Sequence, residues 1–281
     1  MKNGCVVCGS THYKPLYAGI IKCGECGHVF SDLDISNKEV FELYSKNYFC
    51  GEEYSDYLAD KKVLQKNFKL RLKVLKTFLN PIRHRHLLEI GSAYGFFLCI
   101  VSDQFDTVLG IDVTAEGVFY AQEQLKLKVI NSDLLKHDFG IQEFDVVCMW
   151  DTIEHLQNPH LYLKKISNHM GSGSLIAITT GDVESLNARI SKDKWRLIHP
   201  PTHIHYFSKR TLARLLDNYG FDVVYNRYCG FYRSTDMVAY RTLVLSKGLS
   251  RLYNFLCKSR LTSIDFYLNL YDIMYVIAIK R

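Results

Sequence analysis

The sequence contains no long apolar run. None of its 281 residues lies in a window approaching the roughly 20 consecutive apolar residues that a helix needs to cross a bilayer. The first residues also lack an apolar stretch of the kind that directs secretion. These absences argue against an integral membrane protein, and we expect a soluble, cytoplasmic chain.

A strong excess of charge of one sign is also absent. Lys and Arg number 35 against 29 for Asp and Glu, which gives a formal net charge of +6. This excess does not by itself indicate nucleic acid as a partner, and it is compatible with an anionic substrate or an acidic membrane surface. Hydrophobic residues make up 48% and charged residues 23%, proportions that exclude a disordered or coiled-coil chain and allow a substantial core.

Four of the nine cysteines are regularly spaced. They form two Cys-x-x-Cys pairs, each followed by glycine: Cys5, Cys8, Cys23 and Cys26. Because the cytosol keeps thiols reduced, this pattern predicts a metal site, and four cysteines complete a tetrahedral shell around zinc. With no position left for water, the zinc would be structural and would fold a small ribbon over residues 1–35. His12 and His28 are then expected at the surface.

Residues 36–80 are predicted to link the ribbon to the main domain. Apolar residues recur at helical spacing over 61–79, with lysines mostly elsewhere, which predicts an amphipathic basic helix that packs on the following domain and ends before Pro81. Tyr48, Tyr54 and Tyr57 are candidates for a lid over a ligand, although core packing is the commoner role of a single aromatic residue.

From residue 81 onward, short apolar segments alternate with helical ones. Strands are predicted at 87–90, 108–111, 128–130, 144–149, 175–178, 221–228 and 274–279. Helices are predicted at 115–125, at 159–170 after Asn158 as N-cap, and from Ser208 to Gly220. This alternation predicts a doubly wound α/β sheet, which binds ligands at the carboxyl ends of its strands.

The first of these strands runs into the segment Glu89-Ile90-Gly91-Ser92-Ala93-Tyr94-Gly95. A dinucleotide fingerprint would need glycine at positions 93 and 96, where this chain has Ala and Phe, so a nicotinamide cofactor is disfavoured. Glu-x-Gly-x-x-x-Gly after a strand instead resembles the cofactor loop of class I S-adenosylmethionine (SAM)-dependent methyltransferases. The resemblance covers about residues 85–230 and the last strand, and implies a Rossmann-like seven-stranded sheet.

The residues that follow support a SAM site. Asp112 ends the second strand, 23 positions after Glu89, and its carboxylate can accept hydrogen bonds from both ribose hydroxyls. The resemblance implies that Asp133 binds the adenine amino group. Residues 144–156 are similar to the segment after the fourth strand in small-molecule methyltransferases. The expected cofactor-binding residues are Glu89, Gly91, Ser92, Ala93, Gly95, Asp112, Asp133, Leu134 and Trp150.

Candidate catalytic residues lie in a histidine-rich loop at 195–208. This loop resembles that of zinc-ribbon-bearing sugar and secondary-metabolite methyltransferases, in which the matching position, His203 here, is a candidate base. A weakly acidic sugar hydroxyl would need such a base. His205 and His155 are further candidates, whereas His199 and the five remaining cysteines are interpreted as loop or core residues.

Residues 231–272 mix apolar and basic residues and predict helices inserted before the last strand, within a core domain of 81–281. They would cap the acceptor pocket or, alternatively, touch an anionic membrane surface. The predicted function is SAM-dependent methylation of a small molecule, most simply O-methylation of a sugar or nucleotide sugar in surface-glycan or natural-product biosynthesis, with no nucleic acid partner.

Two other functions are compatible with the sequence. One is an RNA base methyltransferase, although the fourth strand lacks the Asn-Pro-Pro-aromatic element used for exocyclic amines. The other is a noncatalytic zinc-ribbon scaffold with a vestigial cofactor site, against which the intact Glu89, Gly91, Gly95, Asp112 and Asp133 argue.

Overall fold

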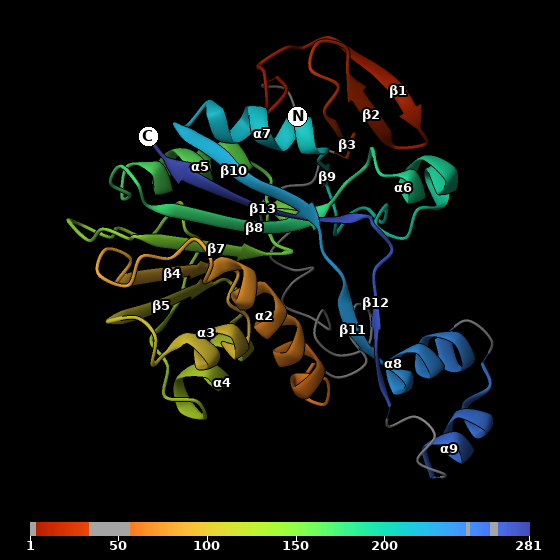
Figure 1. Ribbon diagram of the computed structural model, residues 1–281. Helices are drawn as coiled ribbons and strands as arrows, with labels where there is room; N and C mark the ends of the chain where they lie inside the picture. Colours follow the sequence, from red (N-terminus) through yellow and green to blue (C-terminus); the bar gives the residue numbers. More distant parts are fainter. Residues whose placement is uncertain (1–3, 34–56, 246–247, 259–263) are drawn as a thin grey trace.

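A seven-stranded sheet forms the centre of the protein, in the order β10-β13-β8-β7-β4-β5-β6 (Figure 1). The computed structural model describes residues 4–33, 57–245, 248–258 and 264–281. The strands are β4 (His86–Ile90), β5 (Thr107–Asp112), β6 (Val129–Asn131), β7 (Val146–Trp150), β8 (Leu175–Gly181), β10 (Phe221–Tyr228) and β13 (Ile273–Lys280). Only β13 runs antiparallel to its neighbours, so the predicted doubly wound α/β sheet is confirmed.

Helices cover both faces of this sheet (Figure 1). One face carries α2 (Lys61–Leu75), α3 (Phe96–Val101) and α4 (Ala115–Glu123). The other carries α5 (Pro159–Ser167) and α7 (Lys209–Asp217). The short helices η2 (Ile153–His155), α6 (Leu186–Ser191) and η3 (Lys192–Lys194) follow β7 and β8. They therefore lie at the sheet edge where a ligand is expected.

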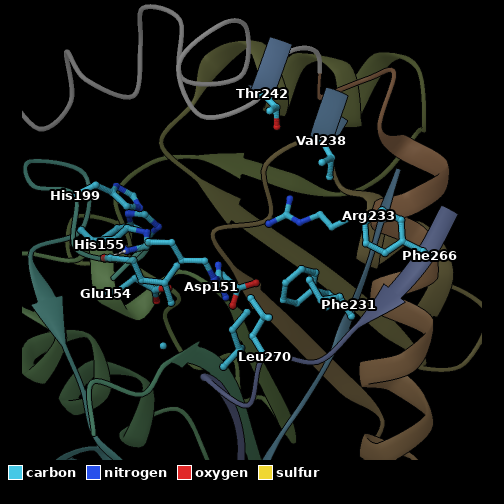
Figure 2. Close-up of a pocket in the computed structure, with 16 residues that line it drawn as sticks. Asp151, Glu154, His155, His199, Phe231, Arg233, Val238, Thr242, Phe266 and Leu270 are labelled. Atoms are coloured by element: carbon cyan, nitrogen blue, oxygen red, sulfur yellow. Dashed lines mark hydrogen bonds between the residues drawn. The ribbon is translucent and has the colours of Figure 1, made fainter. Parts of the chain in front are cut away.

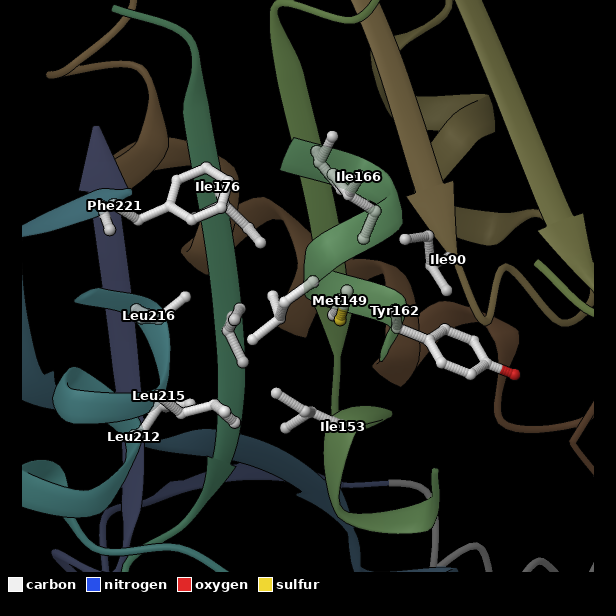
Figure 3. Packing of buried hydrophobic residues seen from close by; sticks show 14 of the residues in the cluster. Ile90, Met149, Ile153, Tyr162, Ile166, Ile176, Leu212, Leu215, Leu216 and Phe221 are labelled. Carbon is white, nitrogen blue, oxygen red and sulfur yellow. The ribbon is translucent and has the colours of Figure 1, made fainter. Parts of the chain in front are cut away.

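The central strands are apolar on both sides, and their side chains alternate between two cores. In β7, Val147 and Met149 pack with α5 and α7, whereas Val146 and Cys148 pack with the α2–α4 face. Figure 3 shows the first of these cores, with Met149 and Ile176 of the sheet facing α5 and α7. Burial on both faces explains why these strands read as continuous apolar runs in the sequence.

The basic helix α2 packs on the main domain, as predicted. Its buried residues are Val63, Phe68, Leu72 and Leu75, and it ends at Leu75, short of Pro81. The prediction that basic residues lie mostly on the other face fails for Arg71, whose side chain is only 12% exposed. Asn158 lies at the start of α5 as expected, but its side chain makes no capping hydrogen bond.

The ribbon shares a sheet with the main domain. Strands β1 (Tyr13–Tyr17), β2 (Ile20–Cys23) and β3 (Val29–Ser31) pair in order, and β9 (His205–Tyr206) adds a fourth strand against β3. The placement of His28 at the surface is wrong. Its side chain is 0% exposed because this junction of ribbon and main domain encloses it.

Helices were predicted between β10 and β13, but the segment also contains two strands. It begins with β11 (Phe231–Ser234) and ends with β12 (Asp265–Leu268), which pair antiparallel. Between them lie α8 (Thr235–Ala239), the π-helical turn η4 (Tyr240–Leu245) and α9 (Ser250–Lys258). We call residues 231–245, 248–258 and 264–270 the arm, since Figure 1 shows β11, β12, α8 and α9 extending away from the sheet.

Two further sequence predictions concern specific segments. Among the helices that the structure describes, none has the length and apolar character required to pass through a bilayer. The lid candidates Tyr48 and Tyr54 lie outside the described residues, whereas Tyr57 is buried and its ring stacks on that of Phe96.

Candidate functional site

A tight loop joins β4 to α3 and forms the first part of the site. Gly91, Ala93 and Gly95 have φ angles of 74°, 46° and 73°, all in the left-handed region. Glycine is required at position 91, because a Cβ there would lie 2.6 Å from Oγ1 of Thr152. Ala93 adopts the left-handed conformation despite its side chain, so the loop keeps its turn without a glycine at this position.

Asp112 holds this loop in place. Its Oδ2 accepts a hydrogen bond from the Ala93 N–H at 2.7 Å, and its Oδ1 accepts bonds from the N–H and hydroxyl of Thr114. Burial raises the pKa of Asp112, and these hydrogen bonds act in the opposite direction. The carboxylate is therefore rigidly placed at the end of β5, next to the end of β4.

Asp133 follows β6 and continues the same edge of the sheet. Its Oδ1 accepts hydrogen bonds from the hydroxyl of Tyr162 at 2.6 Å and from the N–H of Leu135 at 2.9 Å. Leu134 beside it is buried. Because β4, β5 and β6 are adjacent, the structure aligns Glu89, Asp112 and Asp133 along one edge, and Tyr162 is an addition that the sequence did not reveal.

Three buried polar atoms of the predicted cofactor residues have no hydrogen-bond partner in the described structure: Glu89 Oε2, Ser92 Oγ and Trp150 Nε1. Buried polar atoms are normally paired, so atoms left over at a strand edge suit a polar ligand. Burial, with a further contribution from Asp112, raises the pKa of Glu89 well above its usual value. These groups fit SAM, which combines cationic groups with a ribose diol.

Arg71 links α2 to the end of β7. Its guanidinium lies 2.6 Å from Oδ2 of Asp151 and 5.7 Å from the ring centroid of Trp150. Asp151 has a φ of 49°, and its Oδ1 accepts a hydrogen bond from Thr179. The sequence contained a signal for Arg71, since it lies three residues after Phe68 and four before Leu75 and so belongs to the apolar face of the helix.

A pocket of about 390 Å³ lies beside Asp151. One side is formed by η2 and residues 197–203, and the other by the arm and by residues leading into β13. Figure 2 shows Glu154, His155 and His199 on one side and Phe231 and Phe266 on the other, with Arg233 extending between them. Thr152, which contacts the cofactor loop at Gly91, follows Asp151 directly, so the pocket adjoins the expected cofactor site.

Three imidazoles meet in this pocket. The His203 ring centroid lies 4.6 Å from that of His155 and 3.8 Å from that of His199. The structure thus brings two predicted catalytic residues together and adds His199, which the sequence analysis had assigned to the loop or core.

Hydrogen bonds fix the tautomers of two of these rings, those of His203 and His155. Nδ1 of His203 lies 2.9 Å from the Leu197 carbonyl oxygen, and Nδ1 of His155 lies 2.8 Å from that of Thr202. A carbonyl oxygen only accepts, so each Nδ1–H donates and each Nε2 keeps its lone pair. Burial, reinforced by His155 and His199, lowers the pKa of His203 well below its usual value, so this imidazole is neutral at pH 7.

His205 does not reach the pocket. It pairs with Phe30 across β3 and β9, and its Nδ1 lies 3.0 Å from Nε2 of the buried His28. Burial lowers the pKa of His205 to about 4. The short strand turns this side chain toward the ribbon, so the structure separates it from His203 despite the spacing of two residues.

Glu154 is a pocket residue that the sequence analysis missed. Its side chain is 4% exposed and its Oε2 has no hydrogen-bond partner in the described structure. Burial, with a contribution from Asp151, raises the pKa of Glu154 to about 8. Its position directly before His155, in the segment after the fourth strand, was the available signal.

The four ribbon cysteines converge on one point. Sγ of Cys5 lies 3.5 Å from that of Cys26, Sγ of Cys8 lies 3.5 Å from that of Cys23, and all four sulfurs lie within 4.8 Å of one another. Four thiolates around zinc would lie about 3.8 Å apart, as follows from a Zn–S distance of about 2.3 Å. The donor set and its geometry therefore fit a closed, structural zinc site.

The strand order, the loop after β4 and the acidic residues at the ends of β4 and β5 and after β6 define a class I SAM-dependent methyltransferase. The chain belongs to the methyltransferase-domain family, whose model matches residues 61–226. The match begins at α2, so this helix forms part of the family's common structure.

Solved structures and curated proteins agree with this assignment. Magnesium protoporphyrin IX methyltransferase from Synechocystis PCC 6803, solved with bound SAH, is 12% identical with a TM-score of 0.56, over 88% of this chain and 100% of that one. A SAM-dependent methyltransferase from Archaeoglobus fulgidus is 20% identical with a TM-score of 0.54, over 80% and 99% of the two chains. At these identities the likeness shows the fold.

Two curated relatives match parts of the chain. Ubiquinone biosynthesis O-methyltransferase from Glaesserella parasuis is 23% identical over 53% of this chain and 65% of its own length. N-methyltransferase 4 from Papaver somniferum is 32% identical over 30% of this chain and 26% of its own length. The chain thus spans less than two thirds of each of these relatives.

Proposed function

We propose that the protein O-methylates a hydroxyl group of a small molecule, a sugar or nucleotide sugar, with SAM as methyl donor. The observation that supports this most is the pocket beside the cofactor loop, in which three imidazoles face an aromatic and basic arm. Its volume of about 390 Å³ lies within the range typical of small-molecule sites.

The expected cofactor residues take the following roles in this proposal. Asp112 binds the ribose hydroxyls, and Asp133 with the backbone of Leu134 binds the adenine edge. Glu89 faces the cationic amino-acid portion, supported by its unpartnered Oε2. The cofactor approaches the backbone of the loop closely at Gly91, Ser92, Ala93 and Gly95. Trp150 lies beneath the cofactor and offers its unpartnered Nε1 as a hydrogen-bond donor.

The proton of the acceptor hydroxyl leaves to the imidazole pair. SAM supplies a methyl group activated by its sulfonium, so the protein's main tasks are to position the acceptor oxygen and to accept its proton. Nε2 of His203 carries the lone pair, and the Leu197 carbonyl stabilises the imidazolium through Nδ1–H. His155 lies beside it as the second proposed catalytic residue, and His205 is left out because it faces the ribbon.

The pocket favours an oxygen acceptor with an anionic substituent. An amine in its free-base form needs no proton removed before attack, whereas a hydroxyl does, so the imidazoles suit a hydroxyl. Arg233 reaches into the pocket, which supports a phosphate-bearing acceptor such as a nucleotide sugar. The name of the O-methyltransferase relative is in line with this choice.

The remaining parts complete the proposed organisation. Zinc bound by Cys5, Cys8, Cys23 and Cys26 folds the ribbon of residues 1–35, residues 36–80 link it to the main domain, and residues 81–281 form the catalytic core. Within the core, the arm caps the acceptor pocket, which its position along one side supports.

The test is a methylation assay with SAM and a panel of nucleotide sugars, read by mass spectrometry as the gain of one methyl group. We expect His203→Ala to reduce turnover on the accepted sugar by about 10²-fold or more, with little change in S-adenosylhomocysteine affinity, because the base touches the acceptor alone. His169→Ala, an imidazole at the opposite end of β7, serves as control. Methylation of amines but not hydroxyls, or full turnover by His203→Ala, would contradict the proposal.

A further inference from the structure

Glu154, His155 and His203 present their ligating atoms to one another within the acceptor pocket. One ring nitrogen of each histidine and one carboxylate oxygen all lie within 4.8 Å of each other. Two of these residues are adjacent in η2, and the third comes from the loop before β9. The cluster is separate from the four-cysteine site in the ribbon.

The hydrogen bonds around the cluster are those that a metal-binding histidine requires. A ligating imidazole usually donates its second ring N–H to a carbonyl or carboxylate, which fixes its tautomer and orientation. Here the Nδ1–H of His155 donates to Thr202 O and that of His203 donates to Leu197 O. In both rings the lone pair is thereby assigned to Nε2.

The carboxylate provides the second, independent indication. Glu154 is only 4% exposed, so more than nine-tenths of it is buried. Its Oε2 lies in a polar pocket but has no hydrogen-bond partner in the described structure. A buried carboxylate oxygen without a donor is costly, and a cation placed between it and two imidazole lone pairs would remove that cost.

Other charges in the pocket do not exclude a cation. Arg196 lines the pocket, but its guanidinium lies 2.9 Å from Oδ1 of Asp272. Arg233 approaches from the arm side, opposite Glu154 and His155 (Figure 2). Asp151 adds a further carboxylate to the lining. Asp151 is already paired with Arg71, and Arg196 with Asp272, so neither pair adds a net charge beside the cluster.

We infer that Glu154, His155 and His203 bind a divalent transition-metal cation of the Zn²⁺ type, with the remaining coordination positions open to the acceptor pocket. Two imidazoles and one carboxylate form a donor set typical of zinc sites that retain an open position, in contrast to the closed four-cysteine shell. An acceptor hydroxyl that occupied the open position would have its pKa lowered by the cation and would lose its proton to solvent water, since the metal-bound Nε2 of His203 could not accept it; the oxygen would then take the methyl group from the sulfur of SAM. That role rests on the proposed function, whereas the binding itself does not.

The number of zinc ions bound per chain tests this second metal site directly. The full chain is equilibrated by dialysis against micromolar free Zn²⁺, without SAM or acceptor, and its zinc is counted by elemental analysis. We expect two zinc ions per chain in the unaltered protein and one in Glu154→Gln and in His203→Ala. Glu154→Gln keeps the size of the side chain, and a single cooperative thermal unfolding transition would verify that this variant is folded. His169→Ala, which removes an imidazole outside the pocket, should retain two.

Co²⁺ identifies the site from which a metal is lost. In the Co²⁺-loaded chain the cysteine site gives intense thiolate-to-metal bands, and the pocket site gives only weak visible bands. We expect Glu154→Gln to remove the weak bands and preserve the thiolate bands.

One zinc per chain in the unaltered protein, or two in Glu154→Gln and His203→Ala, would overturn the inference. Because the assay contains neither cofactor nor acceptor, a failure of sugar methylation would not alter its result, and a failure to bind the second metal would leave the methylation test unaffected.

Discussion

Asp112 combines two tasks at the level of a single carboxylate. It fixes the loop through Ala93 and Thr114, and in the proposed function it also binds ribose. We predict that Asp112→Ala weakens S-adenosylhomocysteine binding by about 10- to 100-fold, since hydrogen bonds to a charged group contribute about 1.5–3 kcal/mol. Calorimetric titration measures this, with the exposed Asp138→Ala as control. Asp112→Asn keeps the shape, and unchanged affinity in both variants would disprove the ribose assignment.

Glu89 makes the stability of the cofactor-free protein depend on pH. Burial raises the pKa of this carboxyl above its unfolded value, so the native state binds the proton more tightly than the unfolded chain does. Its contribution to stability is therefore present at pH values below about 4.5 and is lost as the pH rises through the raised folded pKa.

Glu89→Gln should remove this dependence. We predict that the variant is more thermostable than the unaltered protein at pH 8, and that this advantage shrinks as the pH approaches 5. The same change should weaken binding of the cationic cofactor. Melting temperatures across this range test the prediction, with the exposed Glu143→Gln as control. A stability difference that does not vary with pH would contradict it.

At the scale of elements, α7 is anchored where the histidine loop ends. Ser208 accepts a hydrogen bond from the Thr211 N–H, and the Thr211 hydroxyl accepts one from the Ser208 N–H, which forms a capping box. We predict that Ser208→Ala destabilises the protein by about 1 kcal/mol, the usual cost of losing an N-cap. Denaturant unfolding measures this, and Ser102→Ala, which follows α3 and caps no helix start, should change stability less.

The elements that sequence reasoning predicted well are the ones that the core defines. All seven strands of the main sheet lie within three residues of their predicted bounds, and the central ones, β4, β7, β8 and β13, are apolar runs buried on both faces. The ribbon strands, β9, β11 and β12 were not predicted. They have two to five residues each, and β3 with β9 and β11 with β12 depend on pairing partners from distant parts of the chain.

The cofactor half and the acceptor half of the candidate site also differ in how well the sequence predicted them. The cofactor half was predictable because its residues follow consecutive strands in chain order. The acceptor half draws on η2, the histidine loop and the arm, so its composition depends on tertiary contacts. Arg71 illustrates the limit, since its burial is explained by Asp151, 80 residues further along the chain. His205 illustrates the same limit, because the pairing of β9 with β3 sets the direction of its side chain.

At the scale of the whole molecule, the ribbon and the histidine loop are parts of one structure. The ribbon's β3 pairs with β9, His28 contacts His205, and Asn218 of the main domain donates to the Val7 carbonyl oxygen. Ile204, next to His203, also donates its N–H to the Glu154 carbonyl oxygen. A loss of order in the ribbon should therefore reach the pocket.

We predict that Cys5→Ser increases hydrogen exchange at residues 204–206 and lowers turnover, while S-adenosylhomocysteine affinity is largely retained, because the cofactor edge lies on other strands. Hydrogen-exchange mass spectrometry and calorimetry measure the two effects. Cys99→Ser, an exposed cysteine outside the ribbon, is the matched control. Unchanged exchange at 204–206 would show that the ribbon and the loop are independent.

The pairing of β3 with β9 also has a consequence for the order in which the protein is made. The ribbon emerges from the ribosome before the main domain, because His205, which completes its sheet, follows His28 by 177 residues. Until His205 has been made, the outer edge of β3 thus has no β9 beside it, and an open strand edge invites pairing with other chains. Early capture of zinc by the two cysteine pairs would give the nascent ribbon a fixed shape during this interval, so zinc supply at the time of translation should affect the yield of folded protein.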